Sequence, residues 1–182
     1  VVGLESGGVE LRERSGAVTR AFEGLEDVVG DLALSPSGEH VAAVSLDGAL
    51  NVYALEADEP VYADEDYDWD AIYGVAWIDA EHVATADAVG RVRVRKVADG
   101  SEVWSVVVEP DEDGDGLSEV HDVEVLPDGR VATISDAGLR VWSAKDGAPL
   151  ASIDTSDVRA VTLAVSPDGA TLAAGMTNGT IV

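Results

Sequence analysis

The chain repeats one pattern of apolar and polar positions five times. In each copy, an apolar residue follows closely after a glycine and opens a short segment in which apolar and polar residues alternate. These five residues are Val9, Leu50, Val92, Leu139 and Ile181, and they are separated by 41, 42, 47 and 42 residues. Alternation with a period of two is the pattern of a β-strand that buries one face.

Three further strand signals lie within each complete unit. The first strand carries spaced apolar pairs such as Val75/Trp77 and Val123/Val125, and Pro-Gly turns such as Pro127 to Gly129 follow it. The second strands begin at Val41, Val83, Val131 and Leu172, and a glycine stands seven residues after each of these starts, at Gly48, Gly90, Gly138 and Gly179. The units therefore predict short antiparallel strands joined by tight turns, with no helical period.

A period of 40–45 residues with four strands per unit is typical of a β-propeller. The segments VTLAVSPDGATLAAGMTNGTIV from Val161 and LRVWSAKDGAPLAS from Leu139 resemble the repeats of the WD40 β-propellers, with Trp142 at the family's tryptophan position. Ser143 stands where the family has aspartate, and no Gly-His dipeptide precedes a first strand, so the family's Asp-His-Ser-Trp brace is expected to be absent. A β-sandwich of similar strand count is the alternative, but the regular period disfavours it.

We expect one all-β domain made of four-stranded antiparallel blades. The chain would start at a third strand and stop inside another, which favours a fragment of a larger propeller over a ring of four blades closed by the two partial units. Further blades would then come from additional sequence or from self-association. The expected divisions are a partial blade at 1–27, blades at 28–70, 71–119 and 120–156, and a partial blade at 157–182.

The charge of the chain is strongly negative. Asp and Glu number 36 against 11 Lys and Arg, which gives a formal net charge of −25, and the only lysines are Lys96 and Lys145. Acidic residues spread over every loop resemble the composition of haloarchaeal proteins, whose self-repulsion is screened by salt. Nucleic acid is an improbable partner for such a surface because its binding depends on Lys and Arg.

Other composition features exclude several classes of site. The absence of cysteine excludes disulfides and thiolate chemistry. No apolar run is long enough to cross a membrane, and no secretory signal is visible near Val1, so we expect a cytoplasmic protein. No nucleophile elbow, phosphate loop or zinc-protease motif occurs.

The 47-residue step contains an acidic insertion that is the best candidate for a metal site. Asp111, Asp113 and Asp115 precede Gly116 in the order of a calcium loop, and Asp122 falls at its twelfth position. The strands expected on both sides exclude an EF-hand. The alternative interpretation is a solvated acidic surface loop, in which case the chain has no cofactor.

Aromatic and basic residues suggest two further features. Tyr67 and Trp69 lie in a second acidic linker, where they could form a partner-binding surface or pack against a blade. Arg91, Arg93 and Arg95 share one face of a strand, and we expect them to form ion pairs with neighbouring carboxylates. Trp77, Trp104 and Trp142 fall at strand positions and are expected to pack between blades.

Two functions are compatible with this pattern. The first is a non-catalytic propeller that presents its loops to a protein partner, which the absence of a catalytic constellation favours. The alternative is an enzyme or a ligand-binding propeller whose central channel holds calcium or a quinone-type cofactor. The acidic insertion and the loose match to the WD40 repeats favour this alternative.

Overall fold

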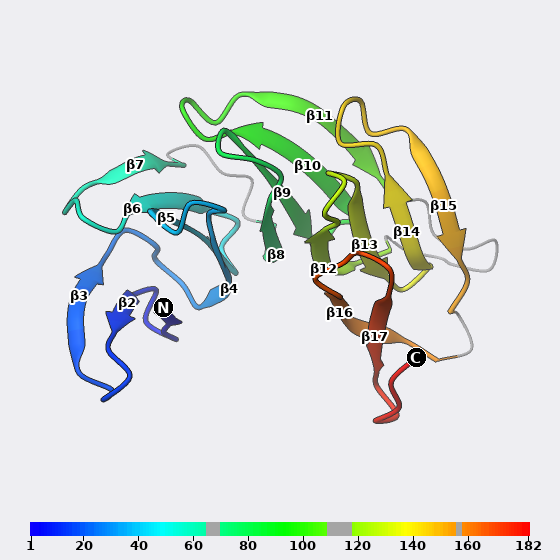
Figure 1. The fold of residues 1–182 in the computed structure, drawn as a ribbon, viewed down its shortest axis with the longest axis horizontal. Coiled ribbons are helices and arrows are strands. Elements are labelled where there is room, and N and C mark those ends of the chain that lie inside the picture. The colour runs from blue at the N-terminus through cyan, green and yellow to red at the C-terminus, as the bar shows by residue number, and fades with distance from the viewer. Residues whose placement is uncertain (65–69, 109–117, 156–157) are drawn as a thin grey trace.

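The structure is a computed structural model that describes residues 1–64, 70–108, 118–155 and 158–182. Within these ranges every regular element is a β-strand, and the strands form five antiparallel sheets. The sheets follow one another along an arc in the order of the chain (Figure 1). The all-β propeller architecture predicted from the repeat period is thereby confirmed.

Three sheets have four strands each. The first contains β4 (Val29–Leu34), β5 (His40–Ser45), β6 (Leu50–Ala54) and β7 (Pro60–Ala63). The second contains β8 (Ile72–Trp77), β9 (His82–Asp87), β10 (Arg91–Lys96) and β11 (Glu102–Val107). The third contains β12 (Val120–Val125), β13 (Val131–Ser135), β14 (Gly138–Trp142) and β15 (Pro149–Ile153).

The two remaining sheets lie at the ends of the arc. The N-terminal sheet contains β1 (Val2–Gly3), β2 (Val9–Arg12) and β3 (Val18–Phe22). The C-terminal hairpin contains β16 (Ala160–Val165) and β17 (Leu172–Met176). The sequence pattern did not predict β1, because two residues are too few to show an alternation. Val2 and Gly3 nevertheless pair with Glu10 and Val9 of β2.

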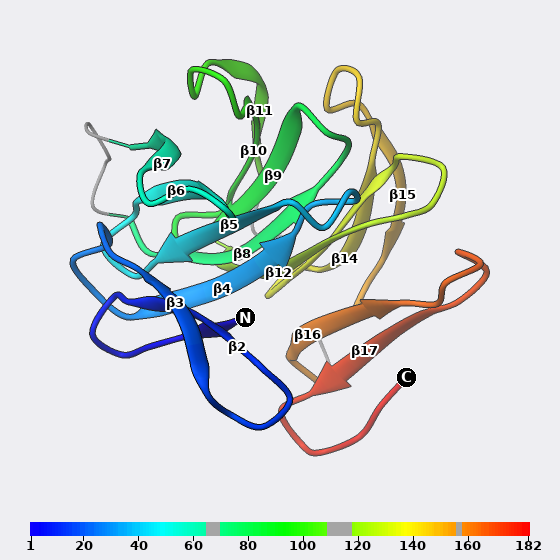
Figure 2. The ribbon, with the colours of Figure 1, turned by 60° about the vertical axis from the view of Figure 1, so that its left-hand side comes forward.

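The first strands of the sheets line the inner side of the arc. Strand β4 lies next to β8, β8 next to β12, and β12 next to β16. The last strands, β3, β7, β11 and β15, lie on the outer side (Figure 1). In the turned view, β4, β8 and β12 again lie beside one another in the middle of the molecule (Figure 2). This arrangement brings the ends of the first strands together, and the candidate site is built there.

The hydrophobic core is divided into four clusters, and each cluster lies between two neighbouring sheets. Val52 and Val83 belong to the cluster between the first and second four-stranded sheets. Trp104 and Trp142 belong to the next cluster. Two more clusters join the N-terminal sheet and the C-terminal hairpin to their neighbours. Most of these side chains are Val and Ala, which agrees with a sequence that contains a single Phe.

The predicted inter-blade packing of the tryptophans is confirmed. Trp77 donates its indole N–H to the carbonyl of Ala33 in the preceding sheet, at 2.9 Å. Trp104 donates to the carbonyl of Ala144 in the following sheet, at 2.7 Å. Both bonds satisfy a buried donor that would otherwise lower the stability of the fold.

The predicted absence of the family's polar brace is wrong in one respect. The indole Nε1 of Trp142 donates to Thr133 Oγ1 at 2.9 Å inside the same sheet, and both side chains are buried. A hydrogen bond between a hydroxyl group and tryptophan is one part of that brace. The Gly-His dipeptide does not indicate this hydrogen bond, because the hydroxyl group belongs to the neighbouring strand.

Candidate functional site

The connections between strands alternate between two faces of the arc, because each sheet is antiparallel and keeps chain order. One face carries the connections between successive sheets and those between the second and third strands, and we call it the linker face. The opposite face carries the other connections, and we call it the turn face. Among the described residues, the linker-face segments are 4–8, 23–28, 46–49, 64, 70–71, 88–90, 108, 118–119, 136–137, 154–155, 158–159 and 177–180.

Both faces are acidic. The described linker-face segments contain 10 Asp and Glu and a single basic residue, Arg159. The turn-face segments contain 11 Asp and Glu and three basic residues; they are residues 13–17, 35–39, 55–59, 78–81, 97–101, 126–130, 143–148 and 166–171. Charge alone therefore does not distinguish the two faces over the described residues.

Each inner strand carries a β-bulge of one extra residue near the linker face. The extra residues are Gly30 in β4, Tyr73 in β8, His121 in β12 and Val161 in β16. Bulges bend a strand locally and redirect its side chains. The rings of Tyr73 and His121 are stacked as a result, with centroids 6.3 Å apart and planes inclined by 28°.

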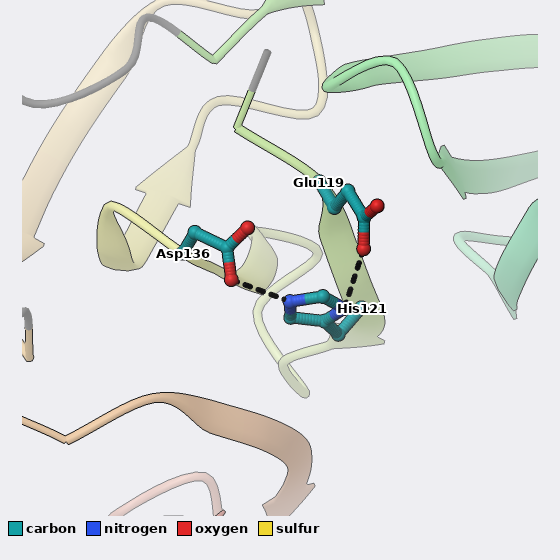
Figure 3. Close-up of side chains that lie close together, drawn as sticks. All are labelled: Glu119, His121 and Asp136. Carbon is teal, nitrogen blue, oxygen red and sulfur yellow. Dashed lines mark hydrogen bonds and ion pairs between the residues drawn. The ribbon is translucent and has the colours of Figure 1, made fainter. Parts of the chain in front are cut away.

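Three potential ligand groups meet at His121 (Figure 3). His121 Nε2 lies 2.9 Å from Oδ1 of Asp136, which belongs to the β13–β14 turn. His121 Nδ1 lies 4.0 Å from Oε2 of Glu119, which immediately precedes β12. The imidazole side chain is only 9% exposed, whereas the two carboxylates are about two-fifths exposed, at 39% and 40%. The cluster is therefore accessible from solvent on the linker face.

Arg159 brings a guanidinium group from the linker before β16 into this cluster. Its Nε lies 2.7 Å from Asp136 Oδ1, and its NH2 group lies 3.0 Å from Glu119 Oε2. The same two nitrogens lie 3.1 and 3.0 Å from His121 Nε2. Arg159 thus links the third four-stranded sheet to the C-terminal hairpin.

Tyr73 next to the cluster remains a neutral phenol. Burial raises the pKa of Tyr73, and the negative charge of Glu119 raises it further. The positive charge of Arg159 lowers the pKa but does not reverse the shift. The phenol therefore offers a hydrogen-bond donor and an aromatic face at this position at neutral pH.

Two aspartates on the inner strands connect neighbouring sheets. Asp31 Oδ2 accepts the backbone N–H of Val75 at 3.0 Å. Asp122 Oδ2 accepts the N–H of Leu163 at 2.7 Å and the hydroxyl of Thr162 at 3.1 Å. Burial raises the pKa of both carboxyl groups, although these hydrogen bonds oppose the shift. They have a structural role in this arrangement, because each carboxylate binds the first strand of the neighbouring sheet.

A polar cavity of about 380 Å³ lies along the inner strands and includes both aspartates. Glu124 also lines it, and its pKa is raised by burial and by the negative charges of Asp122 and Asp31. Three carboxyl groups therefore share this channel. No divalent-cation arrangement of His, Asp and Glu was found there among the described residues.

Of the four residues predicted to bind calcium, only Asp122 lies among the described residues. Asp122 lies on β12 and accepts hydrogen bonds at both carboxylate oxygens, since Oδ1 accepts the N–H of Val123 at 2.8 Å. A calcium ion at Asp122 would have to share the carboxylate with these three hydrogen bonds. Asp111, Asp113 and Asp115 lie outside the described residues. The calcium site therefore remains a prediction.

The other predicted features have different outcomes. Tyr67 and Trp69 also lie outside the described residues, so their role in partner binding remains a prediction. The expected ion pairs of the arginines on β10 are confirmed. Arg95 lies 2.7 Å from Asp64, and Arg91 contacts both Asp70 and Asp87.

The sequence pattern did not predict the cluster around His121. The sequence does place Tyr73 and His121 at the same position of the repeat. Each stands two residues before the first apolar residue of its strand pair, Val75/Trp77 or Val123/Val125. A bulge breaks the period of two at this position, so the alternation does not indicate where these side chains point. The contact with Arg159 carries no sequence signal, because it forms between different sheets.

No helix in the described part of the chain is long and apolar enough to cross a membrane.

Comparisons with known proteins agree with this architecture. Residues 16–53 match the family model described as WD domain, G-beta repeat. No curated protein matches the chain.

Solved structures resemble the chain along nearly all of its length. The Crystal Structure of Mitotic Checkpoint Complex contains a chain with a TM-score of 0.84 and 19% identity, and the match covers 98% of this chain and 58% of that one. The WD40 β-propeller domain of Doa1 has a TM-score of 0.81 and 15% identity, with 98% and 57% covered. The computationally designed Ika4 protein has a TM-score of 0.71 and 17% identity, with 88% and 92% covered.

The chain thus spans 58% of the matched chain in the Mitotic Checkpoint Complex structure and 57% of the Doa1 domain. At these identities, the matches establish the fold and not the activity. The chain has the fold of a WD40 β-propeller, and residues 16–53 carry the repeat signature of that family.

Proposed function

We propose that this chain is a non-catalytic interaction scaffold that binds a protein partner on its linker face. WD40 propellers typically act in this way, and one of the similar chains belongs to a structure described as the Mitotic Checkpoint Complex. The proposal includes the sequence-based expectation of a cytoplasmic protein from a halophilic archaeon. The net charge of −25 supports the halophilic origin.

The observation that carries this proposal is the group of side chains at the inner edge of the linker face. Tyr73 and Arg159 are residue types that are enriched at the energetic centres of interfaces. Tyr73 is held on a bulged strand, and Arg159 is held by two carboxylates, so a partner would find both already in position. Preorganised side chains lose little conformational entropy on binding.

The connections between successive sheets give a second reason to choose the linker face. At high salt, charges act over a few ångströms only. Carboxylates such as Glu119 and Asp136 on this face would therefore act on a partner through close contacts and not through long-range steering. The linkers between sheets are also the segments that vary most in length, from six residues at 23–28 to twelve at 108–119, as expected for loops that determine specificity.

A matched pair of substitutions tests the proposal. Tyr73→Ala removes the aromatic ring that stacks on His121 near the linker face, whereas Leu34→Ala removes an exposed apolar side chain at the turn-face end of β4. Each purified variant is used as bait, and the proteins retained from an extract of the source cells in high salt are identified by mass spectrometry. We expect a partner that the wild type and Leu34→Ala retain and that Tyr73→Ala loses.

Circular dichroism and thermal melting establish that both variants fold. The proposal is wrong if Leu34→Ala loses the same partner while Tyr73→Ala retains it, or if the wild type retains no protein above the level of a bead-only control.

A further inference from the structure

Potential metal ligands of Glu119, His121 and Asp136 surround one point on the linker face. One donor atom from each residue lies within 4.8 Å of the other two. The guanidinium group of Arg159 occupies this point and lies between 2.7 and 3.1 Å from all three side chains. The chain thus places a cation where three ligand atoms of two chemical types meet.

His121 Nε2 cannot satisfy all of its neighbours while Arg159 is present. If Nε2 carries no proton, it accepts a hydrogen bond from Arg159, but its lone pair faces Asp136 Oδ1 at 2.9 Å. If Nε2 carries a proton, it donates to Asp136, but the N–H then faces the N–H groups of Arg159 at 3.0 and 3.1 Å. Either state leaves one close contact between like groups, and such a contact is unfavourable in a partly buried site.

A metal ion in place of the guanidinium removes this conflict. It would accept electron pairs from Nε2 and from both carboxylates at once, so none of the three donors would face a like group. We propose that Glu119, His121 and Asp136 form a binding site for a divalent transition metal of the Zn²⁺ type, which displaces the side chain of Arg159.

The ligand set determines the class of metal. One imidazole nitrogen with two carboxylate oxygens suits Zn²⁺, which is commonly bound by three protein ligands and a water molecule. Calcium and magnesium prefer oxygen ligands alone, so they are poor competitors for a site that depends on His121. This site is therefore separate from the calcium loop predicted at Asp111, Asp113 and Asp115.

Arg159 is able to leave the site because its side chain is 48% exposed. Departure of the guanidinium breaks its contacts with the third four-stranded sheet and releases a positive charge onto the acidic linker face. Metal binding would thus change both the link to the C-terminal hairpin and the charge of the face proposed to bind a partner. The metal site itself does not depend on the proposed protein interaction.

Zinc binding to the purified chain tests the proposal directly. Isothermal titration with ZnCl₂ is performed in excess CaCl₂ and MgCl₂, which saturate the exposed carboxylates. We expect one zinc site in the wild type, and His121→Gln should weaken it by about tenfold or more because the nitrogen ligand is lost. Arg159→Gln removes the competing cation, and we expect it to tighten the site by several-fold.

His82→Gln is the matched control. His82 lies 2.9 Å from Asp79 on the turn face and forms a His–Asp pair outside any three-ligand group found among the described residues. This substitution should leave zinc affinity unchanged. Cobalt substitution gives a second readout, since its visible absorption should be lost in His121→Gln and retained in His82→Gln.

The proposal is overturned if His121→Gln and wild type bind zinc equally, if Arg159→Gln binds more weakly than wild type, or if wild type binds no zinc. Thermal melting without metal confirms that each variant is folded, so a loss of binding is not a loss of structure.

Discussion

Single polar residues decide how the sheets of this propeller are held together. Asp31 and Asp122 each bind the first strand of the neighbouring sheet through a side-chain carboxylate. Gly74 takes the corresponding position in β8, and a Cβ there would lie 3.0 Å from the backbone nitrogen of Val123. Close backbone approach thus replaces the carboxylate contact at this one junction. These features explain how the fold tolerates the loss of most of the family's polar brace.

The remaining part of that brace gives the first prediction. Trp142→Phe should lower the free energy of unfolding by about 1–3 kcal/mol, because it leaves the buried hydroxyl of Thr133 without its donor. Thr133→Val in the same background removes the unpaired hydroxyl and should recover part of the loss. Urea denaturation of the two single variants and the double variant measures the coupling. Strictly additive effects would contradict the interaction.

The channel carboxylates give a second prediction, which concerns pH. The pKa of Glu124 is raised by burial and by Asp122 and Asp31, so the folded state holds its proton to higher pH than the unfolded state does. The contribution of the Glu124 carboxyl group to the free energy of unfolding is therefore greatest below the ordinary pKa of a glutamate. This contribution is lost as the pH rises through the raised pKa of the folded state.

Glu124→Gln should consequently stabilise the protein at about pH 7, by up to about 1 kcal/mol for a half-exposed group. This advantage should shrink when the pH falls below about 4, where the wild-type carboxyl is protonated as well. Urea denaturation at both pH values and fixed salt measures it, with Glu39→Gln at an exposed turn-face position as the control. An advantage that does not depend on pH would show that the charge of Glu124 is not the cause.

The strands and turns were largely predictable from the sequence, whereas the site was not. The glycines at 48, 90, 138 and 179 all have positive φ, between 82° and 101°, and their constant spacing located the turns between second and third strands. Strand alternation is a local property and can be read from neighbouring residues. The cluster at His121 is assembled from β12, the β13–β14 turn and the linker before β16, and local alternation holds no information on such contacts.

Two glycines with positive φ give a third prediction, at the level of the turns. A Cβ at Gly138 (φ 101°) would lie 2.4 Å from the carbonyl oxygen of Ile153, whereas a Cβ at Gly129 (φ 86°) would meet nothing within 4 Å. Both alanine substitutions incur the cost of a left-handed backbone, about 1 kcal/mol or somewhat more. Only Gly138→Ala adds a clash with backbone.

Gly138→Ala should therefore lower the melting temperature more than Gly129→Ala, by several degrees for a domain of this size. Differential scanning calorimetry of both variants in the same buffer makes the comparison. Equal melting temperatures of the two variants would contradict this prediction. They would show that the backbone at Ile153 moves away from the added Cβ without a cost in stability.

At the scale of the whole molecule, the net charge of −25 leads to a fourth prediction. Repulsion among carboxylates opposes folding at low ionic strength and weakens as the Debye length falls from about 10 Å at 0.1 M salt to about 3 Å at 1 M. The free energy of unfolding should rise steeply with KCl over this range. Urea denaturation in KCl measures the effect, and a stability that is independent of KCl would contradict the proposed adaptation to high salt.

The molecule as a whole has two faces, and only the linker face is proposed to bind a protein. Hydrogen–deuterium exchange on the complex with the partner retained by the wild type tests binding at the linker face most directly. We predict protection in the linker-face segments, with the largest change at 154–159 and around Tyr73, and unchanged exchange in the turn-face segments. Protection confined to the turn-face segments would contradict the proposed function.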